Sequence, residues 1–97
     1  MAALTIPKTF ELLGRRYYVR VVPEKKWTED DAVGTFQPAE ALILIKQQRD
    51  TDLMYWAFLH ERTHAIFDAL NELELYQNEK LVDLLAGLIH QAEKSAR

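Results

Sequence analysis

His60, Glu61 and His64 form an H-E-x-x-H pattern inside an apolar stretch of the chain. Side chains four residues apart lie on the same side of a helix, one turn above the other. On a helix, His60 and His64 can therefore direct two imidazoles at one metal ion, and Glu61 lies to the side, within reach of a metal-bound water. Buried polar groups cost free energy unless they are paired, so two aligned imidazoles in an apolar helix need a partner. The pattern predicts a zinc site with two imidazole ligands and a general base.

The third metal ligand must come from elsewhere, because a catalytic zinc site usually has three protein ligands and one position open to water. The chain contains no Cys, so only histidine and carboxylate side chains can serve. The candidates after the pattern are Asp68, Glu79, Asp83 and His90. Asp68 lies one turn beyond His64, which favours a position behind the histidine rather than on the metal. Glu79 and His90 are about 16 Å apart along a helix, so they cannot both bind one ion.

A long central helix is expected to carry the pattern. Asp50 to Asp52 supply capping side chains and acidic charge, which are typical of a helix start. Helical spacing then continues to about Leu70. Apolar residues cover most of its circumference, which is typical of a central helix. Tyr55 and Arg62 share the strip that we expect to be exposed.

A second helix is expected to close the chain. Asn71 to Gln77 is predicted to be a connection, and Asn78 is a good N-cap for a helix from Glu79 to about Lys94. Glu79 and Asp83 share one face of this helix. On the opposite side runs an apolar stripe that must pack on the sheet, on another part of the chain, or on a partner or second copy. The stripe consists of Leu81, Leu84, Leu85 and Leu88.

Two β-hairpins are predicted before the helices. Phe10 to Val22 forms the first, with Gly14 at its turn, and Ala32 to Lys46 forms the second, with its turn at Gln37 to Glu40. The last arm, Ala41 to Lys46, is apolar on both faces, as expected of a strand that is covered on both sides or lies beside a binding groove. We therefore expect one α+β domain over residues 1–97, with a small antiparallel sheet of two hairpins packed on the central and C-terminal helices.

Composition and charge exclude several other functions. The net charge is −3 with scattered Lys and Arg, which argues against a nucleic-acid partner. No apolar run approaches membrane-spanning length, so no membrane association is expected. Met1 to Thr9 lacks the charged start and apolar core of a secretory signal. We expect a cytoplasmic protein.

The H-E-x-x-H pattern followed by Glu79-Lys80-Leu81-Val82-Asp83 resembles the gluzincin arrangement, which has E-x-x-x-D on the next helix. The chain is also similar to short phage and bacterial zincin-like metallopeptidases of the ImmA/IrrE kind in its order of hairpin, H-E-x-x-H helix and glutamate-bearing helix. The resemblance implies that Glu79 is the third ligand and that Asp83 orients His60. It further implies that an extended peptide pairs with an edge strand beside the metal helix. The best candidate strand comprises Ala41, Leu42, Ile43, Leu44 and Ile45.

Two functions compete on these observations. The first is a zinc endopeptidase that cleaves a protein substrate, such as a regulatory protein of a phage or mobile element, with Glu61 moving the proton. The tetrahedral oxyanion of this reaction needs a hydrogen-bond donor, and the sequence does not choose among the four tyrosines, Tyr17, Tyr18, Tyr55 and Tyr76. The second is a non-catalytic module on the zincin scaffold that holds zinc structurally and sequesters a partner protein. The small domain favours the second, whereas the intact Glu61 favours the first, because a binding scaffold needs no carboxylate beside the metal.

Overall fold

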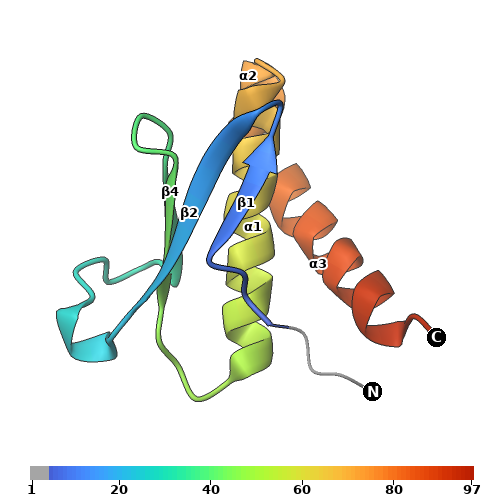
Figure 1. Cartoon of the computed structure of the whole chain (residues 1–97). Helices are drawn as coiled ribbons and strands as arrows, with labels where there is room; N and C mark the ends of the chain where they lie inside the picture. Colours follow the sequence, from blue (N-terminus) through green and yellow to red (C-terminus); the bar gives the residue numbers. More distant parts are fainter. Residues whose placement is uncertain (1–4) are drawn as a thin grey trace.

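The computed structural model describes residues 5–97, which fold as one α+β unit. Met1 to Leu4 lie outside the described residues, and they are part of the segment that was considered for a secretory signal. Three α-helices stack beside a four-stranded sheet in this part of the chain (Figure 1). The strands are β1 (Thr9–Leu12), β2 (Arg15–Val22), β3 (Gly34–Gln37) and β4 (Leu42–Lys46). The helices are α1 (Thr51–Ala69), α2 (Leu73–Tyr76) and α3 (Glu79–Ser95), with a short 3-10 turn, η1, at Glu24–Lys26.

Both predicted hairpins are present, but the sheet that they form is mixed rather than antiparallel. Its strand order is β1-β2-β4-β3, and the central pair, β2 with β4, runs parallel from Tyr18 opposite Leu42 to Val22 opposite Lys46. The prediction of an antiparallel sheet is therefore wrong at its centre. The physical reason is the crossover in residues 23–41, which carries the chain to the far edge before β4 returns beside β2. Parallel pairing requires a long connection of this kind.

The first hairpin turns at Leu13 and Gly14, which both have positive φ angles, 50° and 81°. Two consecutive residues of this kind form the tight turn whose twist matches that of the flanking strands. Arg15, just after the turn, donates hydrogen bonds to the carbonyl oxygens of Pro38 and Ala39 at 2.8 and 3.2 Å. This side chain ties the turn of the first hairpin to the turn of the second.

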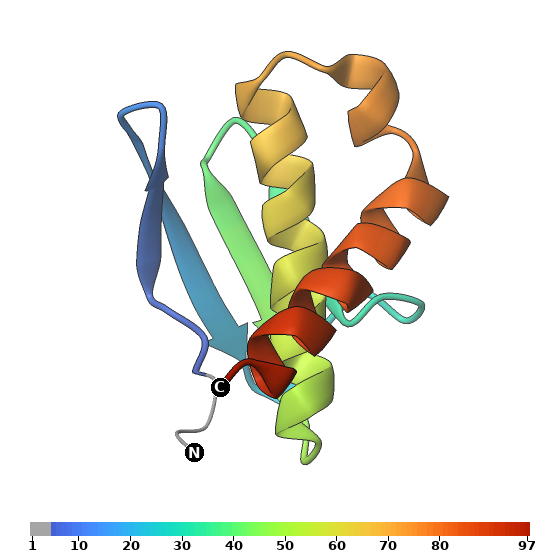
Figure 2. The same ribbon diagram turned by 90° about the vertical axis from the view of Figure 1, so that its right-hand side faces the viewer.

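Helix α1 is the central element, as predicted, and lies between the sheet and α3 (Figures 1 and 2). Asp50 caps its start by accepting a hydrogen bond from the Leu53 amide at 3.1 Å. Ile43 and Ile45 of β4 are fully buried, and they pack in one core with Phe58 and Leu59 of α1. Each fully buried side chain of this size contributes about 1.5–3 kcal/mol of transfer free energy, so this layer fixes the position of α1 on the sheet.

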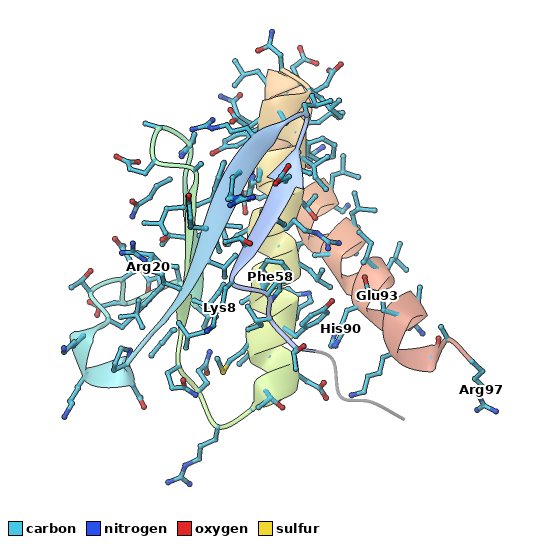
Figure 3. The ribbon with its side chains drawn as sticks, in the orientation of Figure 1. Lys8, Arg20, Phe58, His90, Glu93 and Arg97 are labelled. Carbon is cyan, nitrogen blue, oxygen red and sulfur yellow. The ribbon has the colours of Figure 1, made fainter. Side chains whose placement is uncertain are left out.

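Tyr55 is buried, although the helical pattern predicts an exposed position for it. The reason is α3, which covers this strip of α1 and supplies Glu93 as an acceptor for the Tyr55 hydroxyl at 2.7 Å. The side chain of His90 also points from α3 toward α1 (Figure 3). Its ring lies 5.6 Å from the Tyr55 ring, centre to centre.

Helix α3 begins where the sequence predicts, with Asn78 accepting a hydrogen bond from the Leu81 amide at 3.0 Å. Its Val82 and Ala86 are both fully buried, and Ala86 packs in one core with residues of α1. The connection before it contains one short helix, α2, that the sequence pattern does not predict. The apolar stripe faces outward in part, because Leu84 and Leu88 are 56% and 62% exposed.

No helix within residues 5–97 has both the length and the apolar character needed to cross a bilayer.

Candidate metal centre

Three side chains that could hold a metal ion converge between α1 and α3. His60 and His64 project from successive turns of α1, and Glu79 is the first residue of α3. Glu79 Oε1 lies 2.7 Å from His64 Nε2, and Glu79 Oε2 lies 3.2 Å from His60 Nε2. One ligand atom from each residue fits within 4.8 Å of the other two. The cap at Asn78 places Glu79 opposite the histidines, because it fixes where α3 begins.

This donor set fits zinc. Two imidazole nitrogens and one carboxylate oxygen are typical ligands of a catalytic zinc ion. Bonds of about 2.0–2.1 Å in tetrahedral geometry place ligand atoms about 3.3 Å apart. The carboxylate contacts of 2.7 and 3.2 Å are close to that spacing, and all three ligand atoms lie within 4.8 Å of one another, so side-chain adjustment would admit the ion.

Asp83 lies where the resemblance places it, behind His60. Its Oδ1 is 3.2 Å from His60 Nδ1, one helical turn after Glu79 on α3. If Nδ1 carries the proton and donates it to Asp83, the Nε2 lone pair is left for a metal. Such a bond would fix both the ring orientation and the tautomer that metal binding requires.

Asp68 and His90, the other ligand candidates, lie away from this group. Asp68 lines a separate groove of about 240 Å³ beside α2 and makes no hydrogen bond or ion pair with either histidine in the described chain. His90 lies near the other end of α3, with Nε2 at 3.7 Å from Asp52 Oδ1. The structure therefore brings Glu79 and Asp83 to the histidines and leaves the other two outside.

Glu61 is 9% exposed and lies beside the ligands. Burial raises the pKa of its carboxyl to about 7, with His60 opposing the rise and the Glu79 charge adding to it. Gly34, at the start of β3, is pressed against this side chain: a Cβ there would lie 3.2 Å from Glu61 Cγ and 3.4 Å from Oε2. The absence of a side chain at position 34 lets β3 approach the carboxyl closely.

His64 is buried in the same cluster. Burial lowers the pKa of its imidazole, and the neighbouring His60 lowers it further, while the Glu79 carboxylate acts in the opposite direction. The neutral imidazole is the form that binds a metal. Burial of His64 thus favours the ligand form at neutral pH.

A cleft of about 450 Å³ opens at these candidate ligands. It is lined by Asp31, Ala32, Val33, Gly34, Trp56 and Ala57, together with His60, Glu61, His64 and Glu79. The sequence pattern did not identify the contribution of residues 31–34. Trp56 lies four residues before His60 in the sequence, a spacing that makes the two rings neighbours on a helix. Their centres are 5.8 Å apart.

Of the four tyrosines, Tyr76 lies beside the ligands. Its ring centre is 4.9 Å from that of His64. Tyr17 is buried between Phe10 and Phe36, and the Tyr55 hydroxyl is bonded to Glu93. Tyr18 is half exposed on the sheet. Burial raises the pKa of Tyr76, as do the charges of three nearby carboxylates, those of Asp68, Glu61 and Glu79, so its hydroxyl keeps its proton at neutral pH.

The segment Ala41 to Ile45 does not offer a free edge, contrary to expectation. Leu42 to Ile45 belong to β4, which pairs with β2 on one side and β3 on the other, and Ala41 lies in the turn before this strand. An arm that is apolar on both faces is typical of a central strand, whereas an edge strand is recognised only from its neighbours. The edge strand beside α1 is β3, and its Gly34 lines the cleft.

No family model matches the chain, and comparisons with curated proteins and with solved structures give no significant match.

Proposed function

We propose that this chain is a zinc-dependent peptidase of the zincin-like type, with His60, His64 and Glu79 as metal ligands. The observation that carries the proposal is the convergence of the three side chains at the floor of an open cleft, with Glu61 beside them. A structural zinc site is usually closed by four protein ligands, whereas three ligands facing a cleft leave one position for water. The resemblance to gluzincins and to the ImmA/IrrE kind supports the same ligand set.

In this proposal, each residue of the site has its own role in peptide hydrolysis. Zinc bound at this site would supply a Lewis acid that activates a water molecule and polarises the scissile carbonyl. Glu61 accepts the proton of the attacking water and delivers it to the nitrogen of the leaving amine. Asp83 holds His60 in its binding tautomer. Tyr76, packed on His64, donates to the negative charge that develops on the carbonyl oxygen.

An extended peptide would pair with β3, which replaces the segment proposed from the sequence. β3 is bonded to β4 on one side, and its other side is an edge of the sheet formed by residues 5–97. Main-chain hydrogen bonds to such an edge hold a peptide in an extended form. Because Gly34 lies against Glu61, a peptide on this edge would lie close to the general base. A protein substrate fits this mode better than a small ester does. By the resemblance, we expect a cytoplasmic regulatory protein of a phage or mobile element.

A second candidate function is a zinc-holding module that sequesters a partner protein. The observation that favours it is the outward face of α3, where Leu84 and Leu88 are more than half exposed and Leu81 and Leu85 are half buried. Exposed leucines at helical spacing are typical of a face that packs on another protein or a second copy. In this alternative the metal stabilises α3 and Glu61 has no chemical task.

The substitution Glu61→Gln separates the two functions. The amide is nearly isosteric but cannot accept a proton, and Glu61 is not a proposed ligand, so the variant should keep zinc and fold. A protein captured from the native host by the zinc-loaded variant is then offered to both forms. The control is Glu72→Gln, which is altered at an exposed site. The peptidase is supported if the wild type and this control cleave the captured protein and Glu61→Gln does not. A captured protein left intact by all three forms contradicts it and supports sequestration.

A further inference from the structure

The cleft extends well beyond the metal ligands. Its volume is about 450 Å³, whereas a water molecule occupies only about 30 Å³. Besides the two histidines and the two glutamates, the cleft is lined by residues 31–34, Trp56 and Ala57. Trp56 borders His60, with ring centres 5.8 Å apart. The cleft therefore has room for one side chain of a substrate held over the proposed metal site.

Residues 31–34, which form a rim of the cleft, are held in place by Trp27. The indole Nε1 donates to the carbonyl oxygens of Glu29 and Ala32, at 2.7 and 2.9 Å. At the other end of the rim, the Lys46 amide donates to the carbonyl oxygen of Val33 at 3.0 Å. Residues 31–34 are thus fixed at both ends, by an indole and by β4.

The chemistry of the rim suits a long cationic side chain. Trp56 supplies an aromatic wall, and Val33 and Ala57 extend its apolar surface. Asp31 adds a carboxylate, and it forms no ion pair among residues 5–97. No Lys or Arg of the described part of the chain lines the cleft. Lysine and arginine pack their methylene groups on apolar or aromatic surface and place the charged end beside a carboxylate.

We propose that Asp31 and Trp56 form a subsite for a Lys or Arg side chain next to the scissile bond, and that Trp27 is the positioning residue of this subsite. The inference rests on the proposed peptidase function and specifies its substrate class. An acidic side chain is disfavoured because it would face Asp31. A neutral side chain of equal length would gain the apolar contacts alone.

Binding of three short peptide hydroxamates, identical except for one side chain, tests the proposal without requiring turnover. The side chains are Lys, norleucine and Glu, and calorimetry measures their affinity for the zinc-loaded protein. We expect Lys to bind about three- to tenfold more tightly than norleucine, with Glu weakest. Asp31→Asn should bring Lys to the norleucine level and leave norleucine unchanged. Trp27→Phe, which keeps a ring but loses the N–H donor, should reduce the Lys preference without changing the zinc content.

The control is Asp30→Asn, which removes the same charge one residue away from the cleft lining and should retain most of the Lys preference. Equal binding of Lys and norleucine by the wild type would overturn the subsite, as would a Lys preference that survives Asp31→Asn. In either case, retained zinc and cleavage of a neutral peptide would leave the peptidase proposal standing. Failure of the wild type to bind zinc would instead overturn the peptidase proposal and this inference together.

Discussion

Zinc is expected to stabilise the fold, because its proposed ligands join two helices, α1 and α3, that are separated in the chain by residues 70–78. On α3 only Val82 and Ala86 are buried, while Leu84 and Leu88 face outward. A metal that binds the folded state alone adds about 2.7 kcal/mol when free zinc is 100 times its dissociation constant. For a domain of this length, 1 kcal/mol shifts the melting temperature by about 4–8 °C. Zinc should therefore raise the melting temperature by about 10–20 °C.

Thermal unfolding followed by circular dichroism, with zinc or with a chelator, measures this shift. His60→Ala should abolish most of it, because one ligand is gone. His90→Ala is the matched control, since His90 also lies on the α1–α3 contact but outside the ligand group, 3.7 Å from Asp52. The control should keep the full zinc-dependent shift, whatever its own stability. If the chelated and zinc-loaded wild type melt together, or if His60→Ala keeps the shift, the coupling of metal and fold is refuted.

Three further substitutions probe residues around the ligands. Asp83→Ala should weaken zinc binding about 10–100-fold by releasing His60, and competition with a chelating dye measures this loss; unchanged affinity would remove Asp83 from the site. Gly34→Ala should push Glu61 aside and lower kcat while the zinc content stays at one equivalent, and an unchanged kcat would contradict the close packing against β3. Tyr76→Phe should lower kcat about 10²–10³-fold with zinc binding intact; full activity would exclude its hydroxyl as the oxyanion donor.

The local features of the site could be predicted from the sequence because they depend on helix geometry alone. The spacing of His60 and His64 fixes their common face, and Asn78 fixes the register of Glu79 and Asp83. The gluzincin resemblance then supplied the pairing of the two helices, which spacing within one helix cannot give.

The longer-range features could not be predicted in the same way. The apolar pattern of Ala41 to Ile45 indicates burial but does not reveal which strands lie beside it, so its central position was missed. Tyr55 looked exposed because its partner, Glu93, is 38 residues away in the chain. The rim at Asp31 depends on a side-chain bond from Trp27 to backbone carbonyls, and no periodic pattern signals such a bond. These features depend on contacts between elements rather than on spacing within one element.

Zinc-edge X-ray absorption of the purified wild type tests most directly whether His60, His64 and Glu79 hold the metal. We predict one zinc per chain, with nitrogen and oxygen ligands at about 2.0–2.1 Å and the outer-shell scattering of two imidazoles. Glu79→Gln should retain the signal of two imidazoles but bind zinc more weakly. A spectrum with fewer than two imidazoles, or a wild type that binds no zinc, would contradict the proposed metal centre.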